Sequence, residues 1–296
     1  MKPAHLLPMF LCLICAPALA EPGEALSLVN GSRAEQGLPE LETDAVLQAA
    51  AEAHAEDMLA REYYSHTSPE GEDVRDRVLA AGGSRWSVVA ENIARCEGCG
   101  TPDEAAQVRA FHDGWMQSPG HRANILGQGL DTFGFAMTSD GDTIYAVQTF
   151  SGPGTPPGHD GADEPTAAVP EEVRAAALEA LNAERDGQGR SPLASDAGLD
   201  TLAERLAEGA TFSDDDMVLP DDVFGLLPDE SEGWTSLSVA SEACGGCGAK
   251  AVRSDGAYFA PRLASGGEDQ IFTHMGFALV ANAEGRKVAV AVYGAK

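Results

Sequence analysis

Basic residues are scarce in this chain. Nineteen Lys and Arg stand against 47 Asp and Glu in 296 residues, which gives a formal net charge of −28. Such a surface repels phosphate backbones, so nucleic-acid binding is excluded. Aromatic residues make up only 6% of the chain, and no run after the N-terminus reaches the roughly 18 apolar residues of a membrane helix. The hydrophobic fraction of 44% still excludes a wholly disordered chain, and the length favours two modest domains.

An export signal is predicted at the N-terminus. Lys2 supplies the positive start, residues 6–15 form a short apolar core, and Ala18-Leu-Ala20 provides the small residues for cleavage. We therefore expect a mature protein that begins at Glu21 and is secreted or periplasmic.

The chain contains an internal repeat with a period of about 150 residues. Its clearest part recurs at a shift of 152, in the pairs Leu26 and Leu178, Asn30 and Asn182, Arg33 and Arg185, Gly37 and Gly189, Leu41 and Leu193, Asp44 and Asp196, and Leu47 and Leu199. The Cys-x-x-Cys pairs recur at a shift of 148, and the Gly-Phe-Ala of residues 134–136 recurs at 142. The second copy is therefore shorter by about ten residues.

A linker is predicted between the copies. Residues 151–170 contain five Pro and four Gly with almost no large apolar residue, which is typical of an extended, solvated segment. We predict a signal peptide over residues 1–20, a first domain over 21–152, a linker over 153–170, and a degenerate copy over 171–296.

Each copy is predicted to be an α+β unit. In the first copy we expect helices over residues 25–33 and 44–61. A capping box at Thr101-Pro-Asp-Glu104 opens a third helix. Residues 131–137 and 143–151 are rich in β-formers and flank a turn, so they predict an antiparallel hairpin.

Residues able to do chemistry gather in three stretches of the first copy, which we expect in loops and at helix ends: Tyr64–Gly71, Ala90–Ala94 and Trp115–Leu126. The Ser-Pro-Gly-His-Arg-Ala-Asn-Ile-Leu of residues 118–126 is the most specific of them. It resembles the superfamily of cysteine-rich secretory proteins, antigen 5 and pathogenesis-related proteins, known as CAP or SCP, in its bacterial form.

This resemblance implies a three-layer α-β-α sandwich over residues 25–152, with an open cleft that holds two histidines and two acids. His66 and His121 match the histidines, and Glu91 matches the first acid. At the place of the second acid this chain has Ser118.

Three interpretations of the cleft stay open. Two imidazoles and a carboxylate form an incomplete set of ligands that can hold Zn²⁺ with water in an open position. Glu91 can instead orient one histidine as a general base, so that His66, Glu91 and His121 become catalytic. The third interpretation is a polar network that shapes the cleft without metal or turnover.

Other charged residues fit structural roles better. His54 and His112 lie on apolar helical faces and are expected to be satisfied, partly buried histidines. The acidic runs Asp214–Asp216 and Asp221–Asp222 lack the oxygen spacing of a known calcium loop, so a solvated face is expected.

Four cysteines remain after the signal is removed: Cys96, Cys99, Cys244 and Cys247. They allow three disulfide pairings, and an exporting compartment favours oxidation. Two local disulfides, Cys96–Cys99 and Cys244–Cys247, need no assumption about how the copies dock, and we prefer them. The alternatives are a shared four-cysteine zinc site and a thioredoxin-like redox pair, which the glycine-rich surroundings disfavour.

The second copy lacks the cleft residues. Phe212–Met217 stands near the place of His66, and Ala240-Ser-Glu242 replaces the run around Glu91. No Gly-His-Arg-Ala-Asn precedes Gly276. A second active site is therefore not expected.

Three functional classes remain. The resemblance implies a secreted binding module for a small apolar or cell-envelope ligand such as a sterol, a lipid or cell wall, and we favour this class. The acidity of the chain then favours neutral or cationic partners. The alternatives are a hydrolase of peptide or peptidoglycan bonds that uses the His/Glu cleft or a metal, and a structural or interaction protein of the envelope.

Overall fold

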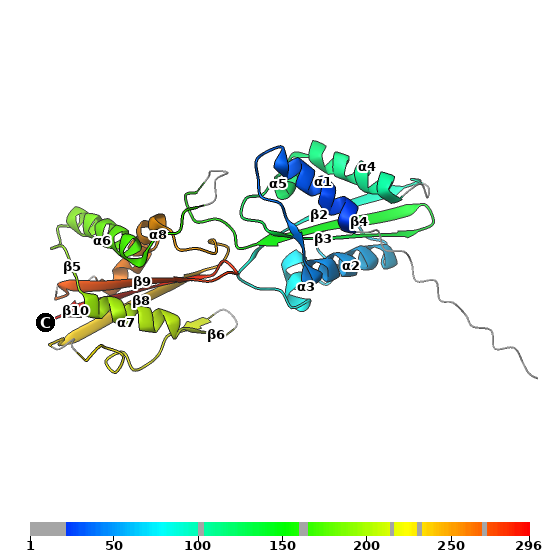
Figure 1. Ribbon diagram of the computed structural model, residues 1–296. Coiled ribbons are helices and arrows are strands. Elements are labelled where there is room, and N and C mark those ends of the chain that lie inside the picture. The colour runs from blue at the N-terminus through cyan, green and yellow to red at the C-terminus, as the bar shows by residue number, and fades with distance from the viewer. Residues whose placement is uncertain (1–21, 100–103, 160–164, 214–215, 230–232, 268–270) are drawn as a thin grey trace, which may run out of the picture.

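A computed structural model describes residues 22–99, 104–159, 165–213, 216–229, 233–267 and 271–296. The predicted signal peptide and the start of the predicted capping box at Thr101 lie outside these residues. The chain folds into two α+β units that meet end to end (Figure 1). Within the described ranges, no helix is both long and apolar enough to cross a membrane.

The first unit is built on a four-stranded sheet with the order β1-β3-β4-β2. β1 pairs with β3 in parallel, and the other neighbours are antiparallel. Its elements are α1 (Pro22–Ala34), β1 (Glu42–Thr43), α2 (Ala45–Ala60), α3 (Val74–Ala80), β2 (Val88–Glu97), α4 (Glu104–Gln117), α5 (Pro119–Ile125), β3 (Thr132–Asp140) and β4 (Thr143–Gly152).

Helices cover both faces of this sheet (Figure 1). The face toward α1, α4 and α5 is filled by large aromatic side chains, Phe133, Phe135 and Phe150. The face toward α2 carries Tyr145 and Val147, which alternate along β4 with residues of the first face. The α-β-α sandwich expected for residues 25–152 is confirmed.

The start of α2 shows how the sequence sets an element. Asp44 has extended backbone angles, and its side chain accepts hydrogen bonds from the amides of Val46 and Leu47 at 2.9 Å each. The apolar stripe then places Leu47 and Met58 in the core at 2% and 0% exposure. The helix predicted over residues 44–61 is therefore confirmed.

The second unit is built on a sheet of the same order, β5-β9-β10-β8. β5 again pairs in parallel, with β9, and the remaining neighbours are antiparallel. Its elements are α6 (Pro170–Gly187), β5 (Ala194–Ser195), α7 (Ala197–Glu208), β6 (Thr211–Ser213), β7 (Asp216–Val218), β8 (Ser236–Cys244), α8 (Arg253–Leu263), the 3₁₀ helix η1 (Ala264–Gly267), β9 (His274–Ala281) and β10 (Lys287–Ala295).

Several contacts occur in both units at matching places. Asn30 exchanges two hydrogen bonds with the backbone of Leu41, at 2.9 and 2.8 Å, and Asn182 does the same with Leu193 at the same distances. Asp196 caps α7 as Asp44 caps α2. The two sequences therefore place the same first helix, loop and second helix on their sheets.

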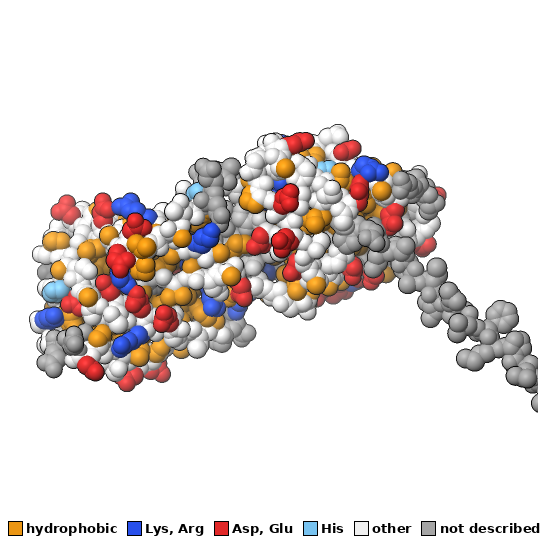
Figure 2. All heavy atoms as spheres, in the orientation of Figure 1, with side chains coloured by type: hydrophobic (Ala, Val, Ile, Leu, Met, Phe, Trp, Pro, Cys, Tyr) orange, Lys and Arg blue, Asp and Glu red, His pale blue; other side chains and the backbone are white. Residues whose placement is uncertain are grey.

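The cysteines pair locally, as Cys96–Cys99 and Cys244–Cys247. The preferred disulfide assignment is confirmed, and the shared zinc site does not form. Figure 2 shows the acidic side chains spread over both units, with a narrow waist where the units meet.

Glycine backbones from both units form much of the contact at this waist. Gly154 pairs with Cys247 in a β-bridge, and Gly246 N donates to the carbonyl of Trp86 at 2.5 Å. Gly154 has a φ of +75°, and a Cβ on it would lie 2.0 Å from the Gly246 carbonyl oxygen, so only glycine fits. Gly154 belongs to the predicted solvated linker, yet its backbone is held in place by the β-bridge to Cys247.

Trp86 is the largest side chain that the first unit contributes to the contact. Its ring meets Phe212 edge-on at 5.1 Å between centroids, and the guanidinium of Arg286 lies 5.3 Å from it. Beside it, Ser84 Oγ donates to Glu284 Oε2 at 2.9 Å. One aromatic pair and a cation–π contact thus join the units through the loop between α3 and β2.

We predict that Trp86→Ala weakens the docking of the two units by about 1–2 kcal/mol, the worth of one aromatic pair and one cation–π contact. Small-angle X-ray scattering should show a larger radius of gyration. Trp234→Ala is the matched control, because Trp234 contacts His274 within the second unit. Equal scattering from both variants would contradict this role of Trp86.

Candidate functional site

Glu91 lies in the middle of β2, an edge strand of the first sheet. We predicted this stretch in a loop or at a helix end, and that prediction is wrong, because residues 88–97 pair continuously with β4. The Glu91 side chain is only 2% exposed. A buried carboxylate is costly unless donors and charges compensate it, so its neighbours define the site.

Two side chains bind the two oxygens of Glu91. His66 Nδ1 donates to Oε1, and Arg77 Nη2 donates to Oε2, each at 2.8 Å. The imidazole is 53% exposed, whereas the Arg77 side chain is 9% exposed. Because Nδ1 is held by the carboxylate, Nε2 is the nitrogen of His66 that can meet a ligand.

Arg77 comes from α3 and was missing from our predicted site. Its guanidinium also donates to the carbonyl of His66 at 3.0 Å, so it fastens the His66 loop to Glu91. α3 begins at a capping box formed by Asp73 and Asp76. That Asp-x-x-Asp spacing is a sequence signal for α3, but the local pattern does not show which carboxylate Arg77 meets.

His54 of α2 lies behind the carboxylate and is 1% exposed. Its Nε2 donates to the carbonyl of Ser65 at 3.1 Å and lies 3.8 Å from Glu91 Oε1. Burial lowers the pKa of His54 more than the charge of Glu91 raises it, so the ring is neutral. The expected satisfied, buried histidine is confirmed.

His121 enters the site from α5. Arg33, which is fully buried on α1, donates to two carbonyls at the end of α5 at 2.9 Å each and fixes that helix. Asn92 Nδ2 donates to the carbonyl of His121 at 3.2 Å. Burial, and then the nearby His66, lower the pKa of His121, which keeps this imidazole neutral at pH 7.

A chain of amide side chains joins β2 to α5. Asn124 Nδ2 donates to the carbonyl of Glu91 and to Asn92 Oδ1, each at 2.9 Å. Asn92 Nδ2 donates in turn to Gln148 Oε1 at 3.1 Å, and both of these side chains are buried. The two asparagines of the sequence motifs therefore hold the strand of Glu91 against the helix of His121.

The other predicted residues lie around this group or away from it. Ser118 is the N-cap residue of α5, and its side chain makes no capping hydrogen bond. His112 of α4 lies 2.9 Å from Ser32 Oγ through Nε2, while its buried Nδ1 has no partner in the described part of the chain. The expectation of a satisfied histidine is therefore wrong for His112. Asp222 accepts a hydrogen bond from Gly225 N in a surface turn, and Asp214 lies outside the described residues.

The donor set limits what the site can hold. Among the described residues, no group of three or more His, Cys, Asp or Glu side chains is placed to hold a metal ion. Both oxygens of Glu91 are bound by His66 and Arg77, so this carboxylate orients an imidazole and does not act as a free ligand. The arrangement offers an anchored, exposed imidazole beside a neutral second one.

We predict that Arg77→Met destabilises the protein by about 3–5 kcal/mol, because it leaves the buried carboxylate of Glu91 without its cation. Adding Glu91→Leu should recover part of the loss, since the uncompensated charge is removed as well. Chemical denaturation followed by circular dichroism measures both. Arg61→Met is the control, because its ion pair with Glu70 is exposed and should matter little. A loss no larger than that of the control would contradict the role of Arg77.

Residues 26–150 match the profile of the family described as "Cysteine-rich secretory protein family", CAP. Over 125 residues the chain is 33% identical to the uncharacterized protein YkwD of Bacillus subtilis, which covers 42% of this chain and 45% of that protein. Over 127 residues it is 32% identical to the uncharacterized membrane protein YlbC of the same organism, with 43% and 33% covered.

A solved structure is also similar, that of an extracellular protein containing an SCP domain from Bacillus anthracis. It covers 44% of this chain and 40% of its own, at 28% identity and a TM-score of 0.36. The chain thus spans less than half the length of these relatives. Residues 26–150 of this protein are a domain of the cysteine-rich secretory protein (CAP) family.

Proposed function

We propose that the CAP domain is an extracellular binding module that captures its ligand at His66 and His121. The observation that carries this proposal is that both carboxylate oxygens of Glu91 already accept hydrogen bonds within the protein. Its two oxygens hold His66 Nδ1 and Arg77, so the exposed imidazole is fixed with Nε2 available to a ligand. Such preorganisation lowers the entropic cost of binding. Two disulfides support an oxidising, exported location.

A divalent metal is the simplest ligand to consider first. A histidine that gives one nitrogen to a carboxylate and presents the other is the usual arrangement around protein-bound zinc. His66 and His121 would supply two imidazole ligands, and water or groups of the ligand would complete the site. Bound there, Zn²⁺ would supply Lewis acidity. We expect weaker binding than at a site with three protein ligands.

The acidity of the chain limits which classes of organic ligand can bind. A net charge of −28 favours neutral or cationic molecules over anionic ones. We therefore propose a neutral apolar or cell-wall ligand for this cleft.

We further propose that residues 171–296 are a degenerate copy without a second cleft. The identical strand orders and the repeated Asn–Leu contacts support this. In the sheets, Cys96 stands opposite Ile144 and Cys244 opposite Lys287, so Val239 takes the place of Glu91. A valine in that place provides no carboxylate to orient a histidine.

We predict that the full-length protein binds Zn²⁺ in isothermal titration calorimetry and that the His66→Ala, His121→Ala double variant does not. Glu91→Gln should weaken binding roughly 10–100-fold, as expected for an outer orienting group. Because burial and the nearby His66 lower the pKa of His121, protons should displace the metal from this imidazole only in acidic solution. His112→Ala is the control, and a heat of binding that survives in the double variant rejects the His66–His121 site.

Hydrolysis is the second candidate, and the 2.8 Å bond between Glu91 and His66 Nδ1 favours it, because it is the orienting half of a general-base pair. We predict that any turnover of casein or peptidoglycan falls roughly 10²–10⁴-fold in Glu91→Gln, the range of general-base contributions. Circular dichroism checks that the variant is folded. Unchanged turnover in Glu91→Gln would reject the mechanism.

A further inference from the structure

The edge of the first sheet is closed by side chains. The outward carbonyl of Glu91 accepts from Asn124 Nδ2 at 2.9 Å. The next outward carbonyl, that of Ile93, accepts from Trp115 Nε1 at 3.0 Å and from Tyr64 Oη at 3.1 Å. Residues 91–93 are all buried. Two outward carbonyls of β2 therefore accept from side chains of the same unit, which obstructs another strand at this part of the edge.

The matching edge of the second sheet is open. The shared register puts Val239 and Ser241 of β8 at the places of Glu91 and Ile93, so their backbone groups also face outward. Ser241 is exposed and Val239 half-buried. Over the described residues, no side chain donates to either carbonyl. A strand edge with unpaired amides and carbonyls is a template for another strand.

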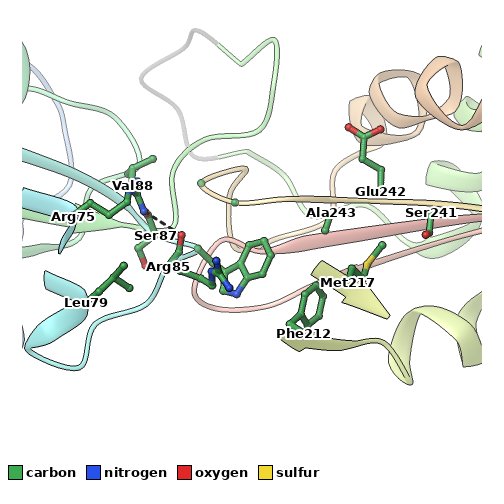
Figure 3. Close-up of a pocket in the computed structure, with 13 residues that line it drawn as sticks. Arg75, Leu79, Arg85, Ser87, Val88, Phe212, Met217, Ser241, Glu242 and Ala243 are labelled. Atoms are coloured by element: carbon green, nitrogen blue, oxygen red, sulfur yellow. Dashed lines mark hydrogen bonds between the residues drawn. The ribbon is translucent and has the colours of Figure 1, made fainter. Parts of the chain in front are cut away.

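A cavity of about 1120 Å³ lies against this edge, between the two units. It is lined by three consecutive residues of β8, namely Ser241, Glu242 and Ala243. Figure 3 shows Ser241 and Ala243 on the side of the strand that faces Phe212 and Met217, with Glu242 on the opposite side. Gly245 and Gly246, just beyond the strand, line it as well, so the cavity lies at the C-terminal end of β8, whose other edge is occupied by β10.

The rest of the lining combines large apolar side chains with two arginines. Phe212 and Met217 line the cavity from the second unit, and Leu79 lines it from the first unit (Figure 3). Trp86 and two arginines, Arg75 and Arg85, also line it from the first unit. Leu79 is 40% exposed. The volume lies above the range of about 300–1,000 Å³ that is usual for small-molecule pockets, which favours a longer ligand.

We propose that β8 binds an extended polypeptide segment, which adds a strand to the second sheet and places an apolar side chain in the cavity between the units. Backbone hydrogen bonds to Val239 and Ser241 provide the pairing, and the aromatic and Met walls provide selectivity. The net charge of −28 over the whole chain disfavours a strongly acidic segment. The proposal is independent of the His66–Glu91 site.

The first test uses a fluorescein-labelled peptide of alternating Val and Thr with Lys at each end. Fluorescence anisotropy with the full-length protein should show saturable binding. The same peptide with alternate amides N-methylated should bind roughly tenfold more weakly or worse, because each lost hydrogen bond is worth about 1 kcal/mol. Equal binding of the two peptides rejects strand addition, and so does absence of binding.

The second test locates the edge. Ser241→Pro removes an outward amide while leaving the ladder to β10 intact, a change that edge strands tolerate. It should abolish peptide binding. Arg95→Pro is the matched control at the edge of β2 and should leave binding unchanged. Hydrogen exchange should show the amides of Val239 and Ser241 protected when peptide is added to the unmodified protein, a readout that needs no variant to fold.

A second copy of this chain is the competing occupant. Multi-angle light scattering without peptide should report a monomer. A dimer that Ser241→Pro dissociates would overturn the proposal in favour of edge-to-edge self-association. Peptide binding that persists in Ser241→Pro but is lost in Arg95→Pro would place the site on β2 and also reject it.

Discussion

The carboxylate of Glu91 is buried in a strand, where an unpaired charge would be strongly destabilising. Arg77 and His66 compensate it from a helix and a loop that lie apart from it in sequence, and the buried His54 closes the space behind it. The exposed ring of His66 is thus held by the carboxylate of Glu91, which is almost fully buried. The position of α3 and the direction of the His66 ring follow from this one requirement.

The two units use one scaffold for different surfaces. Strand order, the parallel short strand, the Asn–Leu clamp and the aspartate cap are common to both. In the first unit, side chains from α4 and α5 and the loop before His66 donate to two outward carbonyls of β2. In the second unit Val239 and Ser241 take the corresponding places, so β8 has no carboxylate where β2 has Glu91. The buried ion pair of this unit lies elsewhere, between Lys287 and Asp255.

The loop that contacts the second unit also connects the two elements that carry Arg77 and Glu91. Residues 81–87 join α3, which carries Arg77, to β2, which carries Glu91. Trp86 of this loop packs on Phe212 and Arg286, and its carbonyl accepts from Gly246 next to the second disulfide. The second unit therefore constrains the connection between two elements that the site depends on. This gives the second unit a physical role at the site of the first.

The sequence alone determined the helix at residues 44–61, the hairpin of β3 and β4 and the local disulfides. Periodicity, caps and short cysteine spacing are local signals, and the motif stretches pointed to His66, Glu91 and His121. Tertiary structure decided that Glu91 lies in a strand, because an edge strand with Glu-Asn at its centre is stable only when Asn124 and Trp115 satisfy its carbonyls. It also decided that Arg77 completes the site and that Gly154 is pinned between the units. These contacts join residues far apart in the chain, and a local pattern carries no information about which distant group a side chain will meet.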